Sequence, residues 1–431
     1  MLDIAYIRNN PQEVAEKLAR RGFEIDFAEF LEADARRRAL MHENEESKAE
    51  RNRQSAQIPV IKKEGGDVSA WTARLRELSD RIKENDILIN TMAEEQLEFL
   101  RAIPNIPSDD IPAGGKENNE VVSVWGEPIP VDASMKNHVE LVESTGMIDY
   151  ERGAKLSGSG FWIYRGAGAV LEWALLNYFI NDHLNDGYEM LLTPHILNYS
   201  CGYVGGQFPK FEEDVFQIRG GGDEFQFILP TAETALTNIH ADEILAEEEL
   251  PKKYFAYTPC YRREAGSYRA NERGMIRGHQ FNKVEMFQYT RPEDSEEAFA
   301  ELVRKAGRLV EGLGLAHRIS MLAAGDCSAG MRKTFDIEIW IPSMQIYKEV
   351  SSVSTAGDYQ ARRGSIRFRR AETGKVEFCH TLNGSGLATS RVIPAIVEQC
   401  QQPDGSIIVP EVLKPWMHGI DVIRPIGEGH A

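Results

Sequence analysis

Cysteine is scarce in this sequence, and its distribution excludes the common cysteine-based frameworks. The 431 residues include five cysteines, an odd number, at positions 201, 260, 327, 379 and 400. They are widely spaced and no CxxC pair occurs, so neither a disulfide framework nor a zinc site is indicated. The pattern is typical of reduced thiols, and a cytoplasmic location is therefore expected.

Long apolar runs are absent as well. No stretch approaches the ~20 residues that a helix needs to span a bilayer, so no membrane partner is expected. The N-terminal "MLDIAYIRNNPQEVAEKL" has no apolar segment behind a basic start. A secretory signal is therefore not predicted.

The chain also lacks an excess of positive charge. It has 49 lysines and arginines against 67 aspartates and glutamates, a formal net charge of -18. This balance argues against indiscriminate binding to nucleic acid but leaves room for a local basic surface. Residues 261–287, "YRREAGSYRANERGMIRGHQFNKVEMF", form such a segment, with five arginines and Lys283.

The length predicts two domains, and the first hundred residues indicate helices. The predicted helices begin at Pro11, near residue 27 and near residue 68, and the predicted breakers are Gly22, Pro59 and the pair Gly65 and Gly66. Proline suits a helix start and glycine suits the position after a helix end. The two long runs, about 27–57 and 68–102, would lie antiparallel because a short turn joins them.

The third helical run carries a coiled-coil pattern. Its heptad positions from 71 to 99 are apolar in seven of nine cases, and Asn85 and Gln96 are the exceptions. At 1.5 Å per residue, ~30 residues make a rod of about 45 Å. Two interpretations stay open: a dimerisation coiled coil or spacer, and a projecting arm that contacts a large partner.

The rest of the chain indicates a linker and an α+β domain. Residues 103–135 are rich in Pro, Gly and Asp and are predicted to be a linker. Residues 136–431 combine an apolar-periodic helix at 168–184 with alternating strands such as "TFDIEIWIP" at 334–342. Such alternation belongs to antiparallel strands with one buried and one working face. No GxGxxG or GxxxxGK[ST] motif occurs, so a nucleotide would be held without either phosphate cradle.

The basic segment is the first of three clusters that could carry chemistry. Period-two alternation can place Arg262 and Glu264 on one face of a strand, and Lys283, Glu285 and Phe287 on one face of the returning strand. Arginine forks suit phosphate oxygens. The plainer alternative is a salt-bridged surface hairpin.

Two further clusters follow along the chain. Glu349 and Ser352 offer oxygen atoms of the kind that Mg²⁺ accepts beside phosphates. The "NGSG" at 383–386 is predicted to be a tight turn before a helix, and Arg391 near that helix start could stack on a flat ring. The plainer alternative for Glu349 and Ser352 is a strand end followed by a Ser-rich turn. For the "NGSG" segment and Arg391 it is a simple turn into a helix with a solvated arginine.

Taken in this order, the segments resemble those of a bacterial seryl-tRNA synthetase, a class II aminoacyl-tRNA synthetase, along essentially the whole chain. The long hairpin resembles that family's tRNA-binding arm. The other matching segments are "LLTPHILN" (motif 1, at the dimer interface), "TAETALTN" (the serine-binding segment), 261–287 (motif 2), "YQARR" and "NGSGLATSR" (motif 3).

The resemblance implies the fold, the reaction and the partners. The fold would be an N-terminal coiled-coil arm, 1–102 with its hairpin at about 27–102, followed by an antiparallel class II sheet flanked by helices. The reaction would join L-serine and ATP, with Mg²⁺, into seryl-adenylate and pyrophosphate. The seryl group would then pass to tRNA(Ser), and the expectation extends to tRNA(Sec). A homodimer is also implied.

The resemblance assigns site residues as well. The serine-binding set is Thr231, Ala232, Glu233, Arg262, Glu285, Asn383 and Ser385. The ATP-binding set is Arg262, Arg263, Glu264, Arg277, Glu349, Val350, Ser351, Ser352 and Arg391, of which Glu349 and Ser352 would also hold Mg²⁺. Arg262, Arg277 and Arg391 would be the catalytic arginines, meeting the α-phosphate, the γ-phosphate and the adenine ring.

The sequence also departs from the family pattern. Val353 and Thr355 stand where the family usually has Cys and Asn, the motif 2 loop reads "ANERG" rather than "RDTRG", and motif 3 ends "LATSR" rather than "LAVGR". These departures suggest a divergent or duplicate enzyme, for instance one that tolerates a seryl-adenylate-like inhibitor. Two other functions stay open: delivery of serine to a carrier protein, and a catalytically inactive binding protein.

Overall fold

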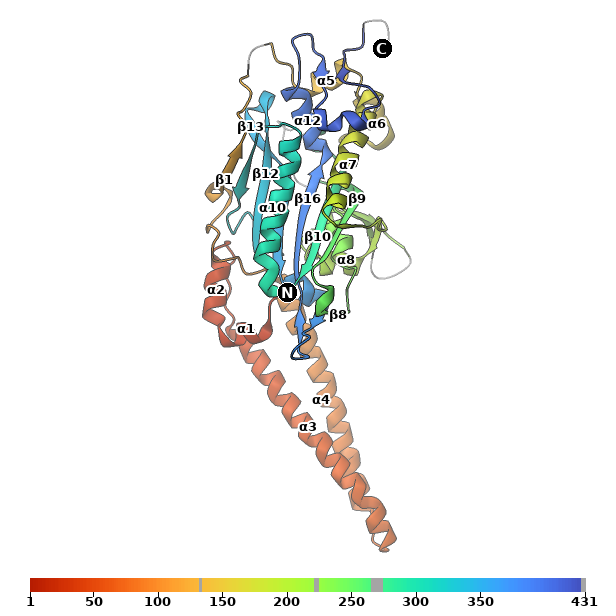
Figure 1. Cartoon of the computed structure of the whole chain (residues 1–431). Helices are drawn as coiled ribbons and strands as arrows, with labels where there is room; N and C mark the ends of the chain where they lie inside the picture. Colours follow the sequence, from red (N-terminus) through yellow and green to blue (C-terminus); the bar gives the residue numbers. More distant parts are fainter. Residues whose placement is uncertain (132–133, 221–224, 265–273, 428–431) are drawn as a thin grey trace. The chain divides into compact units, whose positions relative to one another are not determined.

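The chain folds into two compact units (Figure 1). The computed structural model describes residues 1–131, 134–220, 225–264 and 274–427. One unit is helical and comprises Leu2–Ala19 and Phe23–Pro104; the other comprises Met1, Arg20–Gly22 and the chain from Asn105 onward.

The helical unit begins with two short helices that the sequence predicts. Its helices are α1 (Ile4–Asn9), α2 (Pro11–Ala19), α3 (Ala28–Lys63) and α4 (Ser69–Ala102). Pro11 opens α2, where its missing N–H has no partner to lose. Gly22 has a φ of 75°, a conformation that glycine adopts without strain.

The hairpin of α3 and α4 confirms the coiled-coil pattern. Ile82, Asn85 and Gln96 are buried on the seam, and Asn44 of α3 donates from Nδ2 to Asp86 of α4 at 2.7 Å. The prediction that Pro59 breaks the helix is wrong, because α3 continues to Lys63. Because proline has no N–H, one backbone hydrogen bond is lost. The carbonyl that would have accepted it, four residues earlier, lies on an exposed part of the helix, where water can donate to it instead.

The second unit is built on an eight-stranded sheet. In spatial order its strands are β1 (Glu120–Trp125), β11 (His317–Met321), β12 (Lys333–Ile341), β13 (Ile346–Gly357), β16 (His380–Ala388), β10 (Gln280–Thr290), β9 (Lys252–Tyr261) and β4 (Glu189–Met190). All neighbouring pairs are antiparallel except β4 with β9. The sheet confirms the predicted antiparallel α+β fold.

Three helices pack their apolar faces against this sheet: α7 (Ala167–Asn185), α10 (Ser295–Gly312) and α12 (Thr389–Gln399). Figure 1 shows α10 lying across the middle strands. Val284 and Met286 of β10 belong to this core, so Lys283 and Glu285, one residue out of phase, point to the opposite face. The opposite face is therefore free to carry a site.

Shorter elements complete the unit. The other helices are α5 (His138–Ser144), α6 (Tyr150–Ser157), α8 (Tyr199–Val204), α9 (Glu233–Leu236) and α11 (Tyr359–Arg363). The small sheets are β5 (Ile196–Asn198), β7 (Gln226–Ile228) and β6 (Phe216–Ile218); β15 (Val376–Phe378), β14 (Arg367–Arg369) and β8 (Ile244–Ala246); β2 (Ile148–Asp149) with β3 (Ile163–Tyr164); and β17 (Ile407–Ile408) with β18 (Val422–Ile423).

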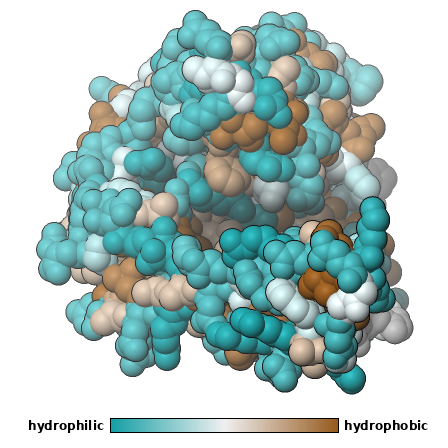
Figure 2. Space-filling view, turned by 90° about the horizontal axis from the view of Figure 1, so that it is seen from below, coloured by the Kyte–Doolittle hydropathy of each residue, from teal (hydrophilic) through white to brown (hydrophobic). Residues whose placement is uncertain are grey.

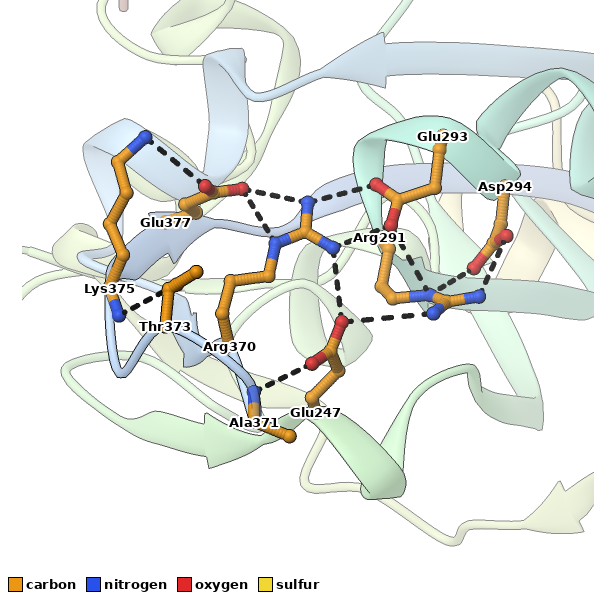
Figure 3. A network of polar contacts seen from close by, with 9 residues as sticks. All are labelled: Glu247, Arg291, Glu293, Asp294, Arg370, Ala371, Thr373, Lys375 and Glu377. Carbon is orange, nitrogen blue, oxygen red and sulfur yellow. Dashed lines mark hydrogen bonds and ion pairs between the residues drawn. The ribbon is translucent and has the colours of Figure 1, made fainter.

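A charged network ties three of these segments together (Figure 3). Arg370, at the end of β14, donates to Glu247 after β8, to Glu293 before α10 and to Glu377 of β15. Arg291 adds contacts to Glu247, Glu293 and Asp294. The hydrogen bond from Arg370 lowers the pKa of Glu293 to about 2.

Replacing Arg370 with glutamine should lower the free energy of unfolding by about 1–2 kcal/mol, because three carboxylates would lose their shared cation. Urea unfolding at low salt measures this loss, and about 0.5 M NaCl should shrink it by screening. Lys375→Gln is the control, since the Lys375 side chain is 72% exposed and its ion pair in this network is with Glu377. Equal losses for both variants would contradict the central role of Arg370.

One face of the surface and the long helices bear on whether the chain could enter a membrane. The face drawn in Figure 2 is mostly hydrophilic, and its hydrophobic residues lie in separate patches. Within the described ranges, no helix combines the length and the apolar character needed to cross a bilayer.

The five cysteines are all free, as the sequence predicts.

Candidate active site

A polar cavity lies on the working face of the sheet, at strands β10, β13 and β16. Its lining residues are Arg262, Glu264, Ile276, Arg277, Gly278, Phe281, Lys283, Glu349, Val350, Ser385, Ala388, Ser390 and Arg391. All three predicted clusters therefore contribute to one cavity, although they are up to about 130 residues apart along the chain.

Arg262 reaches the cavity from the end of β9. Its N–H donates to the His279 carbonyl at 2.9 Å, which extends the pairing of β9 with β10 by one rung. Its Nε donates to the Pro230 carbonyl at 3.3 Å, and its guanidinium lies 5.3 Å from the centre of the Phe281 ring. These contacts orient the guanidinium beside the other cavity residues.

Glu264 and Arg277 also line the cavity, where they form an ion pair. The prediction that Glu264 continues the strand is wrong, because its φ is 50°. The turn in the backbone nevertheless leaves Glu264 and Arg262 in the same cavity. Arg263 is exposed and donates from its guanidinium to the Glu213 carbonyl at 3.0 Å.

The motif 2 loop departures at 270–273, with Arg269 and Arg273, lie outside the described residues.

Glu285 is the centre of a buried polar cluster. It is 1% exposed and accepts from Asn383 Nδ2 at 3.0 Å and from Ser385 Oγ at 3.3 Å. It also pairs with Lys283, which donates to Thr231 Oγ1 at 2.8 Å. Ser385 lies directly opposite Glu285 in the β10–β16 register, so the two side chains share a face.

Glu233, the first residue of α9, lies deeper in the same region. Its Oε1 accepts from Gln360 Nε2 at 3.0 Å. Burial, reinforced by the nearby Glu285 carboxylate, raises the pKa of Glu233 to about 7. The adjacent Thr231 and Ala232 are buried as well. The region therefore holds an acid that an incoming cation would help to ionise.

A bulge in β13 explains how Glu349 and Ser352 come to lie on one face. Residues three apart on a regular strand point to opposite faces, but the register with β12 shifts so that Val350 is an extra residue. Glu349 therefore lies opposite Glu338, and Ser352 lies opposite Asp336. The neighbouring Ser351 points elsewhere and donates from Oγ to the Ser385 carbonyl at 2.6 Å.

The carboxyl groups at this bulge have opposite pKa shifts. Burial and the nearby Glu349 carboxylate raise the pKa of Asp336 well above its usual value. Burial also acts against ionisation of Glu349, but Arg391, Arg262 and Lys283 together hold its pKa below the usual value. Two acids in such proximity form a place where an added cation is electrostatically favoured.

Arg391 stands in the first turn of α12 and reaches back over the cavity. It donates from Nη1 to the Glu349 carbonyl at 2.7 Å and from Nε to the Ile276 carbonyl at 3.3 Å. The same Nη1 lies 3.4 Å from Glu349 Oε2. The prediction that Arg391 stands near a helix start is confirmed.

The prediction that residues 383–386 form a tight turn is wrong, because all four lie inside β16. Gly384 pairs with Met286 on one side and with Val353 on the other. A Cβ at position 384 would lie 3.0 Å from Val353 Cγ2, so this glycine permits close strand packing rather than a turn. Val353 and Thr355, two of the departures, are buried.

Two residues of this region were not assigned from the sequence. The spacing of two places Lys283 on one face with Glu285, as the sequence predicts, but the sequence assigns Lys283 no role in the site. Gln360 lies in the "YQARR" segment and joins Glu233 to Thr381, whose Oγ1 donates to Gln360 Oε1 at 2.6 Å. No sequence spacing predicts that contact, since the three residues lie on different elements.

Family models match most of the chain. Residues 1–107 match the seryl-tRNA synthetase N-terminal domain. Residues 216–400 match the tRNA synthetase class II core domain of the G, H, P, S and T types.

Individual relatives cover nearly the full length. The chain is 60% identical to serine–tRNA ligase 2 of Clostridium acetobutylicum over 420 residues, which are 97% of this chain and 99% of that protein. It is 45% identical to the serine–tRNA ligase of Thermodesulfovibrio yellowstonii, with 98% and 100% covered. Among solved structures it is similar to the Pyrococcus horikoshii seryl-tRNA synthetase complexed with ATP, at a TM-score of 0.91 and 33% identity, with 99% of this chain and 100% of that chain covered. The chain therefore belongs to the seryl-tRNA synthetase family of class II aminoacyl-tRNA synthetases.

Proposed function

We propose that this chain activates L-serine with ATP and transfers the seryl group to tRNA(Ser). The observation that carries the proposal is the single cavity that Arg262, Lys283, Glu349, Ser385 and Arg391 line together. It joins cations suited to a triphosphate with a cluster of hydroxyl and carboxylate groups.

The nucleotide would occupy the side of the cavity that holds the arginines. Arg391 would stack on the adenine ring and Glu264 would accept from the adenine amino group. Arg262 would meet the α-phosphate and Arg277 the γ-phosphate. Since Arg277 and Glu264 are paired with each other, binding of ATP would have to separate them. Arg263, Val350 and Ser351 are proposed to support this side through the backbone rather than by direct charge.

Serine would occupy the side of the cavity that leads to Glu285. Glu285 and Ser385 would read its hydroxyl, Asn383 would hold Glu285 in place, and Glu233 would meet its ammonium group. Thr231 and Ala232 would line the pocket, and Arg262 would meet the carboxylate. Such a pocket rejects alanine strongly, because its buried polar groups would be left without partners.

Mg²⁺ fits the bulge of β13. Glu349 and Ser352 offer oxygen ligands on one face, and the raised pKa of Asp336 indicates a surplus of carboxylate there. The described residues contain no cluster of three or more His, Cys, Asp or Glu side chains arranged around a metal, so phosphate oxygens would complete the shell. When bound, the ion would neutralise charge on the phosphates.

No side-chain nucleophile is needed for this reaction. The serine carboxylate attacks the α-phosphorus and pyrophosphate leaves, so the chain contributes positioning and stabilisation of charge. Arg262, which faces both reacting groups, would stabilise the charge that develops at the α-phosphate.

One assay sequence tests the proposed function. Serine-dependent ATP–pyrophosphate exchange is expected, followed by charging of tRNA(Ser), and tRNA(Sec) is a second expected acceptor. Absence of exchange would indicate an inactive binding protein. Exchange without charging would indicate delivery to a carrier protein.

Serine binding should depend on pH through Glu233. Because the pKa of Glu233 is raised to about 7, its ionised form is lost as pH falls below 7, and the KM for serine should rise up to about tenfold per pH unit there. Glu233→Gln should raise this KM at pH 8 and remove the dependence. Exchange kinetics at saturating ATP measure both effects, and an unchanged profile in the variant would contradict the role of Glu233.

The partners follow from the same proposal. The hairpin of α3 and α4 would contact tRNA(Ser). Exposed apolar residues support a homodimer: Leu192 and Ile196 in motif 1, and Trp173 and Leu184 on α7. The mass of a single chain in solution would contradict a homodimer.

A further inference from the structure

Glu172 of α7 is a buried carboxyl group that the proposed reaction does not use. It is 3% exposed. Its Oε1 accepts two hydrogen bonds at 2.7 Å, from Asn282 Nδ2 of β10 and from Thr389 Oγ1 of α12. One oxygen atom thus joins three elements that are far apart in the sequence.

The two donors belong to the segments that carry the proposed site. Asn282 precedes Lys283, and Thr389 is the first residue of α12, two positions before Arg391. Thr389 Oγ1 also lies 3.2 Å from the Asn282 carbonyl, its second acceptor. Thr389 stands in the motif 3 ending where this chain departs from its family, so the departure has a structural partner in Glu172.

We propose that Glu172 is a positioning residue for adenylate formation, which fixes the start of α12, and with it Arg391, against β10. The inference rests on the proposed function, because Arg391 matters only if adenine binds over it. Arg391 lies in the first turn of α12, so loosening residue 389 moves the guanidinium that donates to the Glu349 carbonyl.

The second oxygen of Glu172 makes the contact sensitive to protonation. Glu172 Oε2 and the Tyr164 hydroxyl are buried, and neither makes a hydrogen bond of ordinary geometry with another described residue. Burial raises the pKa of Glu172 to about 7, against the hydrogen bonds from Thr389 and Asn282 and a weaker polar contact with the Tyr164 hydroxyl. The ionised form accepts stronger, charge-assisted hydrogen bonds from these two donors.

The groups around Glu172 do not titrate in the same range. Tyr164 of β3 and Tyr257 of β9 face it, and burial raises the pKa of both, with a further upward effect from the Glu172 carboxylate. Tyr257 donates to Asn282 Oδ1 at 3.3 Å. The β10 and α12 contacts are the neutral side chains of Asn282 and Thr389, so none of these groups titrates near pH 7. A transition near pH 7 that Glu172→Gln removes therefore belongs to Glu172 and not to Glu233 of the serine pocket.

Exchange kinetics with ATP varied from about pH 5.5 to 8.5 test the proposal. In the unmodified chain the KM for ATP should fall several-fold as pH rises through about 7. Glu172→Gln keeps an acceptor oxygen but has no charge, so it should retain exchange and lose this step. Glu172→Ala and Thr389→Val should raise the KM for ATP about tenfold and change kcat and the KM for serine less than about threefold.

Thr145→Val is the matched control. Thr145 is a buried threonine at the C-terminal end of α5 that donates to the Leu141 carbonyl at 2.7 Å, so its removal costs one hydroxyl that makes no hydrogen bond with Glu172, Asn282 or Thr389. If Glu172→Ala does not fold, Thr389→Val still tests the contact. A pH step in Glu172→Gln equal to that of the unmodified chain, or Thr389→Val kinetics equal to those of Thr145→Val, would overturn the proposal. The proposed function fails separately, if the unmodified chain shows no exchange at all.

Discussion

Replacing Arg262 with alanine should reduce serine-dependent ATP–pyrophosphate exchange by about 10³-fold or more. Arg262 is proposed to meet both reactants, the serine carboxylate and the α-phosphate, so its loss removes stabilisation that grows as the new bond forms. A single lost donor to a developing charge already costs ~10²–10³ in kcat. The effect should appear in kcat and in the KM values for both substrates, because the same guanidinium faces both.

The fold of the variant should be unaffected, because Arg262 makes one side-chain hydrogen bond of 3.3 Å and a ring contact among its described partners. Arg308→Ala is the control for loss of an arginine. Arg308 pairs with Asp182 and Asp186 between α10 and α7, away from the cavity. Exchange by Arg262→Ala within about tenfold of that by Arg308→Ala would mean that another cation meets the α-phosphate.

The sequence predicted the elements of the site better than their local geometry. Periodicity alone located α7 and β12, because an apolar stripe at a fixed period leaves few alternatives. The paired charges Lys283 and Glu285 could be placed on one face for the same reason. These predictions depend on residues that are close in sequence.

The bulge at Val350 lay beyond such reasoning. Regular alternation would send Glu349 and Ser352 to opposite faces, and only the oxygen atoms they offer and the resemblance suggested that they act together. The extra residue appears only in the register between β13 and β12. Register depends on the partner strand, and a single strand carries little information about it.

Glycine was ambiguous for a similar reason. "NGSG" is a strong turn signal when it is considered locally, yet Gly384 lies between two strands that leave no room for a side chain. Both uses of glycine follow from its missing Cβ. Only the neighbours, Val353 and Met286, decide which one applies.

Shortening the arm should separate the two chemical steps. Replacing residues 45–85 with a short Gly/Ser linker would leave the hydrogen bond from Asn44 to Asp86 as the last contact of the hairpin. Exchange should stay within about twofold of the full-length value, because every residue that lines the cavity belongs to the other compact unit. Charging of tRNA(Ser), measured as kcat/KM for the tRNA, should fall at least about 10²-fold, which corresponds to about 3 kcal/mol of lost binding.

Replacing residues 52–78, which include the turn between α3 and α4, with the same short Gly/Ser linker is less drastic and provides a graded comparison. The two helices would still meet at matched positions, because the contacts of Asp34 with Gln96 and of Asn44 with Asp86 are preserved. If the arm binds tRNA along its length, this variant should charge tRNA(Ser) at an intermediate rate. Full charging by both variants would contradict the assignment of the arm to tRNA, and would favour a dimerisation coiled coil or a spacer. Because the net charge of the chain is -18, nonspecific attraction offers little to replace the lost contacts, so the deletion should weaken tRNA binding rather than redirect it.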